Sequence, residues 1–180
     1  TYTDKEGFGG VGMAELLQEV IVGSVGDYTC KVLPGSGAEV TLADTDITHI
    51  GGTVNAQLDD ASLGNQKFIS ISATADYDYQ GGRFNGEGQA EVHLDKKLAE
   101  LGGQRFFLGA GSGAKVGVKD NNLASVGGTI NLRLDDDEGT YLNVSLGGTL
   151  DASSGVFNGK GTTECCREKK LAQLGDYSFW

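Results

Sequence analysis

The sequence predicts an all-β protein with a few minor short helices, and three observations carry that prediction. Apolar and polar residues alternate over several segments, which is the pattern of strands with one buried face. Glycine is abundant, with 30 residues against the single proline Pro34, so many turns are expected between short strands. A constant offset also aligns residues 8–60 with residues 84–136 without a gap. The expected fold is therefore an internally repeated antiparallel β-barrel or β-sandwich.

The repeat places about two and a half units of 76 residues in the chain. The block Gly35–Ala38 returns as residues 111–114, and after a three-residue deletion Phe157-Asn158-Gly159 restates Phe84-Asn85-Gly86. A half-unit has too little apolar surface to fold alone, so we expect one pseudo-symmetric domain. This domain covers residues 1–180, with a half repeat (1–50), a full repeat (51–126) and a partial repeat (127–180).

Strands are expected where the alternation is clearest. Val40 and Leu42 begin the series, and Val54, Ala56 and Leu58 share one face of the next strand. Residues 67–77 then alternate aliphatic and small polar side chains, and residues 141–150 repeat that pattern one unit later. A length change after Leu58 between the two units marks an exposed hairpin tip. Each unit is thus interpreted as an antiparallel meander with one buried and one solvated face.

One short helix is expected in each unit. In residues 95–102, Leu98 and Leu101 lie three positions apart and Gly102 stands where a helix C-terminal cap is placed; residues 168–175 repeat the pattern. The Gly-Ser-Gly-Ala block is interpreted as a hairpin turn, because it lacks the lysine and spacing of a phosphate loop. Since the termini interrupt the repeat, the last strand is expected to pair with the first and remove both sheet edges.

The net charge and the cysteines indicate which classes of partner and which cellular compartment to expect. A formal net charge of −11 without a basic patch argues against nucleic acid binding, and no run is long enough for a membrane-spanning helix. Cys30 and Cys165 occupy repeat positions that hold apolar residues in other copies, which predicts buried thiols. A disulfide from Cys30 to Cys165 or Cys166 is the alternative. The chain begins without methionine, which favours a secreted or cell-surface protein and leaves a cytoplasmic one open.

Catalytic groups are scarce, whereas acidic groups recur. His49 and His93 have no counterpart in the repeat, so we expect no catalytic residue and favour a protein that is not an enzyme. Acidic residues recur at equivalent positions of the repeat. They are interpreted either as oxygen ligands for Ca²⁺ or as residues that form turns without a bound ion. The candidate calcium ligands are Asp44, Asp46, Asp59, Asp60, Asp135 and Asp136.

Three functional hypotheses remain open from the sequence. The first is a non-enzymatic, exported β-repeat module that recognises a glycan or another surface partner, with Ca²⁺ as its candidate cofactor. Its ligand-binding candidates are the aromatic residues Tyr77, Tyr79, Tyr141 and Trp180. The second is a closed β-barrel that binds or transforms a small apolar ligand. The third is a structural or assembly protein, a homo-oligomer whose sheet edges pair between chains.

Overall fold

The computed structural model describes residues 9–44, 46–166, 172–174 and 177–179, and within them the protein is all-β. One short 3₁₀ turn, η1 (Ala61–Leu63), interrupts the strands. The strands are β1 (Gly10–Glu15), β2 (Val20–Val25), β3 (Tyr28–Val32), β4 (Gly37–Ala43), β5 (Asp46–Asp60), β6 (Gln66–Asp78), β7 (Arg83–Val92), β8 (Lys96–Leu101), β9 (Gln104–Leu108), β10 (Gly113–Lys119), β11 (Asn122–Asp136), β12 (Gly139–Asp151), β13 (Val156–Cys165), β14 (Ala172–Leu174) and β15 (Tyr177–Phe179).

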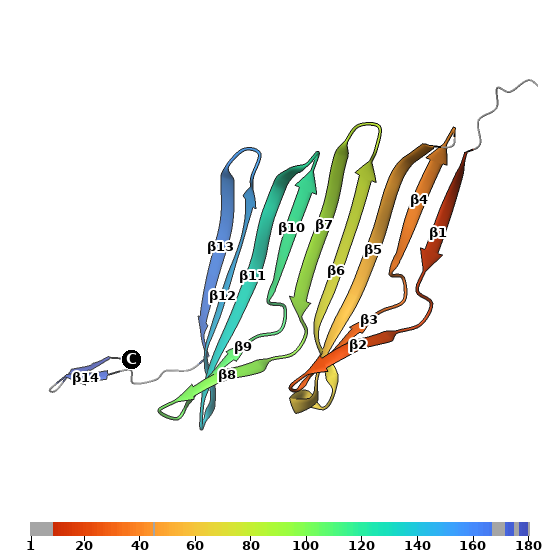
Figure 1. Ribbon diagram of the computed structural model, residues 1–180. Helices are drawn as coiled ribbons and strands as arrows, with labels where there is room; N and C mark the ends of the chain where they lie inside the picture. The colour runs from red at the N-terminus through yellow and green to blue at the C-terminus, as the bar shows by residue number, and fades with distance from the viewer. Residues whose placement is uncertain (1–8, 45, 167–171, 175–176, 180) are drawn as a thin grey trace, which may run out of the picture.

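Thirteen of these strands form one antiparallel meander. The main path runs β1-β4-β5-β6-β7-β10-β11-β12-β13. The hairpins β2–β3 and β8–β9 attach through β3 to β5 and through β9 to β11. Figure 1 shows the long strands side by side in a single layer, with both hairpins at one end. The strands β14 and β15 form a separate pair. The predicted meander and its alternating strands are thereby confirmed.

The sheet is open, so the expected closure into a barrel or a sandwich is wrong. The strands β1 and β13 lie at opposite edges of the sheet (Figure 1) and do not pair. The reason lies in the strand count. Nine strands follow one another antiparallel along the main path, so the first and the last point in the same direction. Closure would require a parallel pair that occurs nowhere else in this sheet.

The bounds of the strands follow the sequence offset. The strands β2 to β5 begin and end 76 residues before β8 to β11, as 20–60 compares with 96–136. The strands β6 and β7 stand 73 residues before β12 and β13, because the tip between β11 and β12 is three residues shorter. In the first unit that tip contains η1, which places the length change in a hairpin connection as expected.

The predicted helix over 95–102 is wrong, because this segment is the strand β8 and its turn. Gly102 and Gly103 both have positive φ angles, 59° and 76°, which is the backbone of a two-residue hairpin turn. A glycine at that place resembles a helix C-terminal cap in sequence. A register shift between Lys97 and Ala99 disturbs the strand alternation and leaves the three-residue leucine spacing. The predicted helix 168–175 lies largely outside the described residues.

Buried serines anchor the loops that lead into β4 and β10. The Ser112 hydroxyl donates a hydrogen bond to Gly109 O at 2.7 Å and accepts one from Asn131 N at 2.9 Å. Ser36 makes the matching bonds to Leu33 O and from Asn55 N, both at 2.8 Å. The first two residues of each Gly-Ser-Gly-Ala block therefore belong to the connection, which the serine fixes to the neighbouring long strand, and the last two begin β4 or β10. The predicted hairpin turn is wrong, because β3 and β4 both pair with β5 and not with each other.

The cysteines differ from expectation in burial and in pairing. All three are free thiols; Cys30 is half-buried and both Cys165 and Cys166 are exposed. Cys30 pairs through β3 with β5, whereas Cys165 lies on the edge strand β13, several strands away along the sheet. A disulfide needs Cα atoms roughly 5.5 Å apart, so the suggested bond from Cys30 is excluded within the chain. Within the described part of the chain, no helix has the length and apolar character that a bilayer crossing requires.

Candidate functional site

One face of the large sheet is apolar across the seven neighbouring strands from β5 to β13. Cross-strand partners point to the same side of an antiparallel sheet, so the register defines each face. One row across seven strands consists of Val54, Ala73, Gly88, Val116, Val126, Leu150 and Phe157. The next row consists of Ala56, Ile71, Ala90, Ala114, Gly128, Gly148 and Gly159. Neither row contains a polar side chain.

This apolar face, defined by the two rows above and by Ile130 and Leu146 beside them, lies uncovered. The exposed fractions of Val54, Ile130 and Leu146 are 51%, 52% and 53%. Only Phe68, Val92 and Tyr141 are buried hydrophobic residues in the described part of the chain. Most protein domains bury such a face against a second layer, and here the described residues provide none. Sequence analysis identified the alternation correctly but assigned the apolar side to an interior.

The apolar face is hollowed where small residues gather. A hollow of about 600 Å³ is lined by the Gly128, Gly148 and Gly159 backbones, with Ile130 and Leu146 among the side chains around it. The Phe157 ring lies over Gly148 and Gly159, since a Cβ built on either glycine would collide with the ring. The face therefore offers both protruding aliphatic side chains and a recess.

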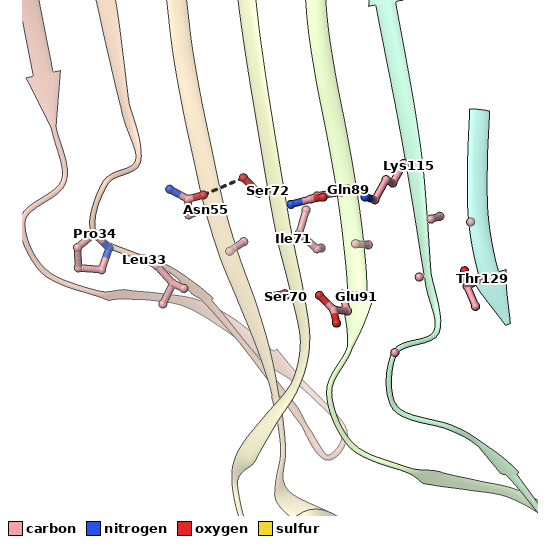
Figure 2. Close-up of a pocket in the computed structure, with 16 residues that line it drawn as sticks. Leu33, Pro34, Asn55, Ser70, Ile71, Ser72, Gln89, Glu91, Lys115 and Thr129 are labelled. Carbon is pink, nitrogen blue, oxygen red and sulfur yellow. Dashed lines mark hydrogen bonds between the residues drawn. The ribbon is translucent and has the colours of Figure 1, made fainter. Parts of the chain in front are cut away.

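The opposite face is polar and carries a groove. Figure 2 shows Asn55, Ser72, Gln89 and Lys115 in a row across β5, β6, β7 and β10. The Ser72 hydroxyl donates a hydrogen bond to Asn55 Oδ1 at 3.0 Å. The groove measures about 600 Å³, and the loop carrying Pro34 forms part of its wall. Its side chains can donate and accept hydrogen bonds, which suits a hydroxylated ligand.

The same polar arrangement returns one unit later. Asn131, Ser145 and Thr162 stand in a row across β11, β12 and β13, and the Ser145 hydroxyl donates to Asn131 Oδ1 at 2.7 Å. These residues line a second hollow of about 450 Å³. Its row ends at Thr162, because β13 is an edge strand. A position equivalent to Lys115 is therefore not filled by the described residues of the chain.

A serine and a histidine meet at the lower end of the polar groove. The Ser70 hydroxyl and His93 Nε2 lie 2.7 Å apart, a contact that sequence reasoning missed because 23 residues separate them. Asn143 and Cys166 stand at the equivalent positions, with Asn143 Nδ2 3.3 Å from Cys166 Sγ. A hydrolytic serine also needs an acid behind the histidine and donors for an oxyanion. No hydrogen bond from His93 to an acidic side chain occurs among the described residues.

The most deeply buried side chain is the carboxylate of Asp60, at the tip between β5 and β6. It accepts hydrogen bonds from Ser62 N at 2.8 Å and Ser62 Oγ at 2.6 Å, and it pairs with Lys96 from β8. The Lys96 ammonium also lies 5.3 Å from the centre of the Tyr28 ring. The bond from Lys96 is the main cause that lowers the pKa of Asp60, and the same pair raises the pKa of Lys96. This cluster connects β8 with the tip between β5 and β6.

The other candidate calcium ligands lie in separate surroundings. Asp59 pairs with Lys31 at 2.9 Å, and Asp135 accepts hydrogen bonds from Arg133 Nε at 3.1 Å and from Thr140 at 2.8 Å. Asp136 accepts a hydrogen bond from Glu138 N at 2.9 Å, as a turn former does. Asp44 follows β4 and Asp46 begins β5, at the opposite end of the sheet. No cluster of three or more His, Cys, Asp or Glu side chains suited to a metal occurs among the described residues.

The candidate aromatic residues lie at different ends of the sheet. Tyr77 and Tyr79 form an edge-to-face pair with ring centres 4.7 Å apart. Tyr141 is buried, and its hydroxyl donates to Gln104 Oε1 at 3.1 Å. Trp180 lies outside the described residues. Tyr77 pairs with Ile50 and so lies on the apolar face, away from the polar groove.

Comparison of the chain with protein-family models, with curated proteins and with solved structures found no match.

Proposed function

We propose that the protein is a non-enzymatic assembly module whose apolar face is covered by the same face of a second copy. The observation that carries this proposal is the uncovered row of apolar residues across seven strands, in which Val54, Val116 and Val126 have exposed fractions of 51%, 43% and 43%. Contiguous apolar patches of this kind mark association surfaces on soluble proteins, because their exposure to water is unfavourable. Two such sheets placed face to face form the sandwich core that a single chain does not build.

The size of the face supports a stable pair. On the same side of the sheet, apolar residues continue along β5 from Ile50 to Leu58 and along β11 from Val126 to Leu134. At about 3.3 Å per residue this is an extent of about 30 Å, so seven strands about 4.8 Å apart give a face of roughly 900 Å². A typical stable interface covers about 800 Å² on each partner. The apolar face therefore meets this requirement without contributions from the hairpins.

Shape and charge favour a second copy as the partner. The face combines protruding side chains at Val54 and Ile71 with the glycine-lined recess near Gly148, so a two-fold axis can place each protrusion over the partner's recess. Its two central rows contain no charged residue, whereas polar side chains such as Gln89 and Lys115 lie on the opposite face. In a face-to-face pair of copies, the polar face of each sheet stays in contact with water.

A lipid surface suits this face less well. A bilayer interior does not satisfy backbone groups, and this sheet has unpaired edges at β1 and β13. The recess over Gly128 and Gly148 also calls for a partner of matching shape.

The test is a matched pair of charge substitutions on adjacent residues. Ile130 lies on the apolar face and Thr129 on the polar face. We expect the wild type and Thr129→Glu to sediment as dimers and Ile130→Glu as a monomer. An unpaired charge in the interface costs about 3 kcal/mol or more, which weakens association at least 100-fold.

Two results would contradict the proposal. One is a monomeric wild type at the highest soluble concentration; the other is equal dimerisation of Ile130→Glu and Thr129→Glu. Flotation with phosphatidylcholine vesicles, abolished only by Ile130→Glu, would instead assign the face to lipid. Circular dichroism of both variants would show that strand content is preserved.

A second candidate function is glycan recognition in the polar groove. It is favoured by the hydrogen-bonded row from Asn55 to Lys115, which recurs as Asn131, Ser145 and Thr162. In this account Tyr77 and Tyr79 contribute only at the end of the sheet, and Ca²⁺ remains a candidate ligand of the acidic loops.

A thermal-shift series tests this second candidate, because a ligand that binds only the folded state raises the melting temperature. A glycan panel with and without Ca²⁺ should raise the melting temperature of the wild type and not that of Gln89→Ala. An equal rise in the melting temperature of both proteins would show that the glycan does not bind in the groove.

A further inference from the structure

We propose that the free edge of β13 pairs with β4 of a second copy, in the register in which β7 pairs with β10 within the chain. This contact uses a sheet edge and is independent of the apolar face. The partner is another copy of this chain. In that copy β4 releases its own β1 and pairs with the incoming β13.

The free edge of β13 is equivalent to the edge of β7 that pairs with β10. Val92 and Ala90 of β7 pair with Ile69 and Ile71 of β6, and Cys165 and Thr163 of β13 pair with Leu142 and Val144 of β12. Each residue of the second set stands 73 positions after its counterpart. The register on the inner side is therefore the same, and the outer edge of β13 repeats the edge that β10 occupies.

Backbone hydrogen bonds identify which residues of that edge are available. In β7, Val92 N donates to Ser112 O at 2.7 Å, and Phe84 O accepts from Asn121 N at 3.0 Å. Alternate residues of a strand direct their N–H and C=O groups to the same neighbour. The corresponding groups in β13 belong to Phe157, Gly159, Gly161, Thr163 and Cys165. No described strand pairs with this side of β13.

The glycines of β13 match the branched residues of β4. Val116 of β10 stands opposite Gly88, and a Cβ on Gly88 would lie 3.3 Å from Val116 Cγ1. By the same register Val40 stands opposite Gly161, and Leu42 opposite Gly159. Both pairs lie on the apolar face, which then continues without a break from one copy to the next.

The start of β13 has an asparagine equivalent to the one that hydrogen-bonds β7 to the neighbouring turn. The turn between β10 and β11 forms two hydrogen bonds with β7. Asp120 N donates to Asn85 Oδ1 at 2.9 Å, and Phe84 N donates to Asn121 Oδ1 at 2.8 Å. Asn158 is the counterpart of Asn85, and its side chain makes no hydrogen bond to the described residues. Asp44 of the second copy, which follows β4 and has a positive φ like its counterpart Asp120, would reach it.

The polar face of β4 fits β13 better than it fits β1. In the chain, Glu39 and Thr41 stand opposite Met13 and Val11, whose exposed fractions are 76% and 59%. In the exchanged pair they stand opposite Thr162 and Lys160. Glu39 also gains a diagonal cation, since directly opposed and diagonal partners interact on one face.

The exchanged strand also completes the second polar row. Asn131, Ser145 and Thr162 form that row within the chain. The register places Glu39 of the second copy next to Thr162, where Lys115 stands next to Gln89 in the first row. Strand exchange of this kind keeps nearly all hydrogen bonds, so concentration decides between the two partners.

Disulfide trapping tests the register directly, in chains whose three native cysteines are replaced by alanine. Chains carrying Glu39→Cys and chains carrying Thr162→Cys are mixed and oxidised. This pair is of the non-hydrogen-bonded kind, in which side chains approach closely. We expect a mixed covalent dimer at least fivefold more abundant than with Thr163→Cys, which points to the other face.

The chain supplies its own positive control. Gln89 and Lys115 are the equivalent pair within one chain, so the double variant Gln89→Cys/Lys115→Cys should form an internal disulfide. Formation of that bond without a mixed dimer from Glu39→Cys and Thr162→Cys would overturn the proposal. Repeating the mixture with Ile130→Glu in both chains separates edge pairing from face association, because only the former should persist.

Discussion

At the scale of single residues, a buried ion pair joins the β8–β9 hairpin to a distant strand connection. Asp60 lies at the tip between β5 and β6, and Lys96 reaches it from β8. Ser62 and the Tyr28 ring complete its surroundings. Besides the backbone pairing of β9 with β11, this polar cluster is a side-chain contact between the hairpin and the tip of β5 and β6.

The pair predicts a stability that depends on pH in the acid range. Because its bond to Lys96 lowers the folded-state pKa of Asp60, the carboxylate stabilises the protein fully above the unfolded pKa of about 3.9. That contribution is lost as the pH falls below this value and through the folded pKa. We expect Asp60→Asn to lower stability at pH 7 and to lose less stability than the wild type between pH 5 and pH 2.

Urea unfolding across this pH range provides the measurement. Asp137→Asn, at an exposed position in the next hairpin tip, is the matched control and should follow the wild-type curve. Parallel acid profiles for Asp60→Asn and the wild type would show that the ion pair does not contribute. At the alkaline end, the raised pKa of Lys96 implies stability that persists below about pH 10.4 and is lost above it.

At the scale of elements, glycines allow neighbouring strands to approach closely. A Cβ on Gly113 would overlap the carbonyl oxygen of Ala90 in β7, and Gly37 stands in the same relation to Ala14 in β1. The recurrence of these contacts explains why Gly35–Ala38 and 111–114 are identical. Sequence analysis noted the block but assigned it only to a turn.

Replacement of Gly113 by alanine should separate β7 from β10. Overpacking of this kind costs about 1–3 kcal/mol, so the urea midpoint should fall accordingly. Gly10→Ala is the control, because a Cβ there meets no atom within 4 Å. It should be neutral or slightly stabilising through the unfolded chain. Equal stability of the two variants would contradict the close approach.

Sequence patterns determine most elements here and miss those set by turn geometry. The strands β6 and β12 follow from strict alternation, as their observed bounds confirm. The strand β8 was missed because Gly102 looks like a helix cap, whereas its positive φ, together with that of Gly103, forms a hairpin turn. Contacts such as Ser70–His93 join distant segments, and a single sequence carries no signal for them.

At the scale of the whole molecule, the described sheet has one uncovered apolar face and, along its main path, free edges at β1 and β13. Alternation predicts that one face is buried but does not say against what, which is why closure was expected. The odd number of strands along the main path prevents β1 and β13 from pairing antiparallel. Burial of the apolar face must therefore come from outside the described sheet, and we assign it to a second copy.

The most direct measurement is the rate of maleimide labelling of single cysteines at positions 129 and 130, as a function of protein concentration. In a background without the native cysteines, Ile130→Cys should be protected at high concentration and become reactive on dilution. Thr129→Cys, on the polar face, should react quickly throughout. Equal and rapid labelling of both positions at every concentration would show that the apolar face is not covered and would contradict the account.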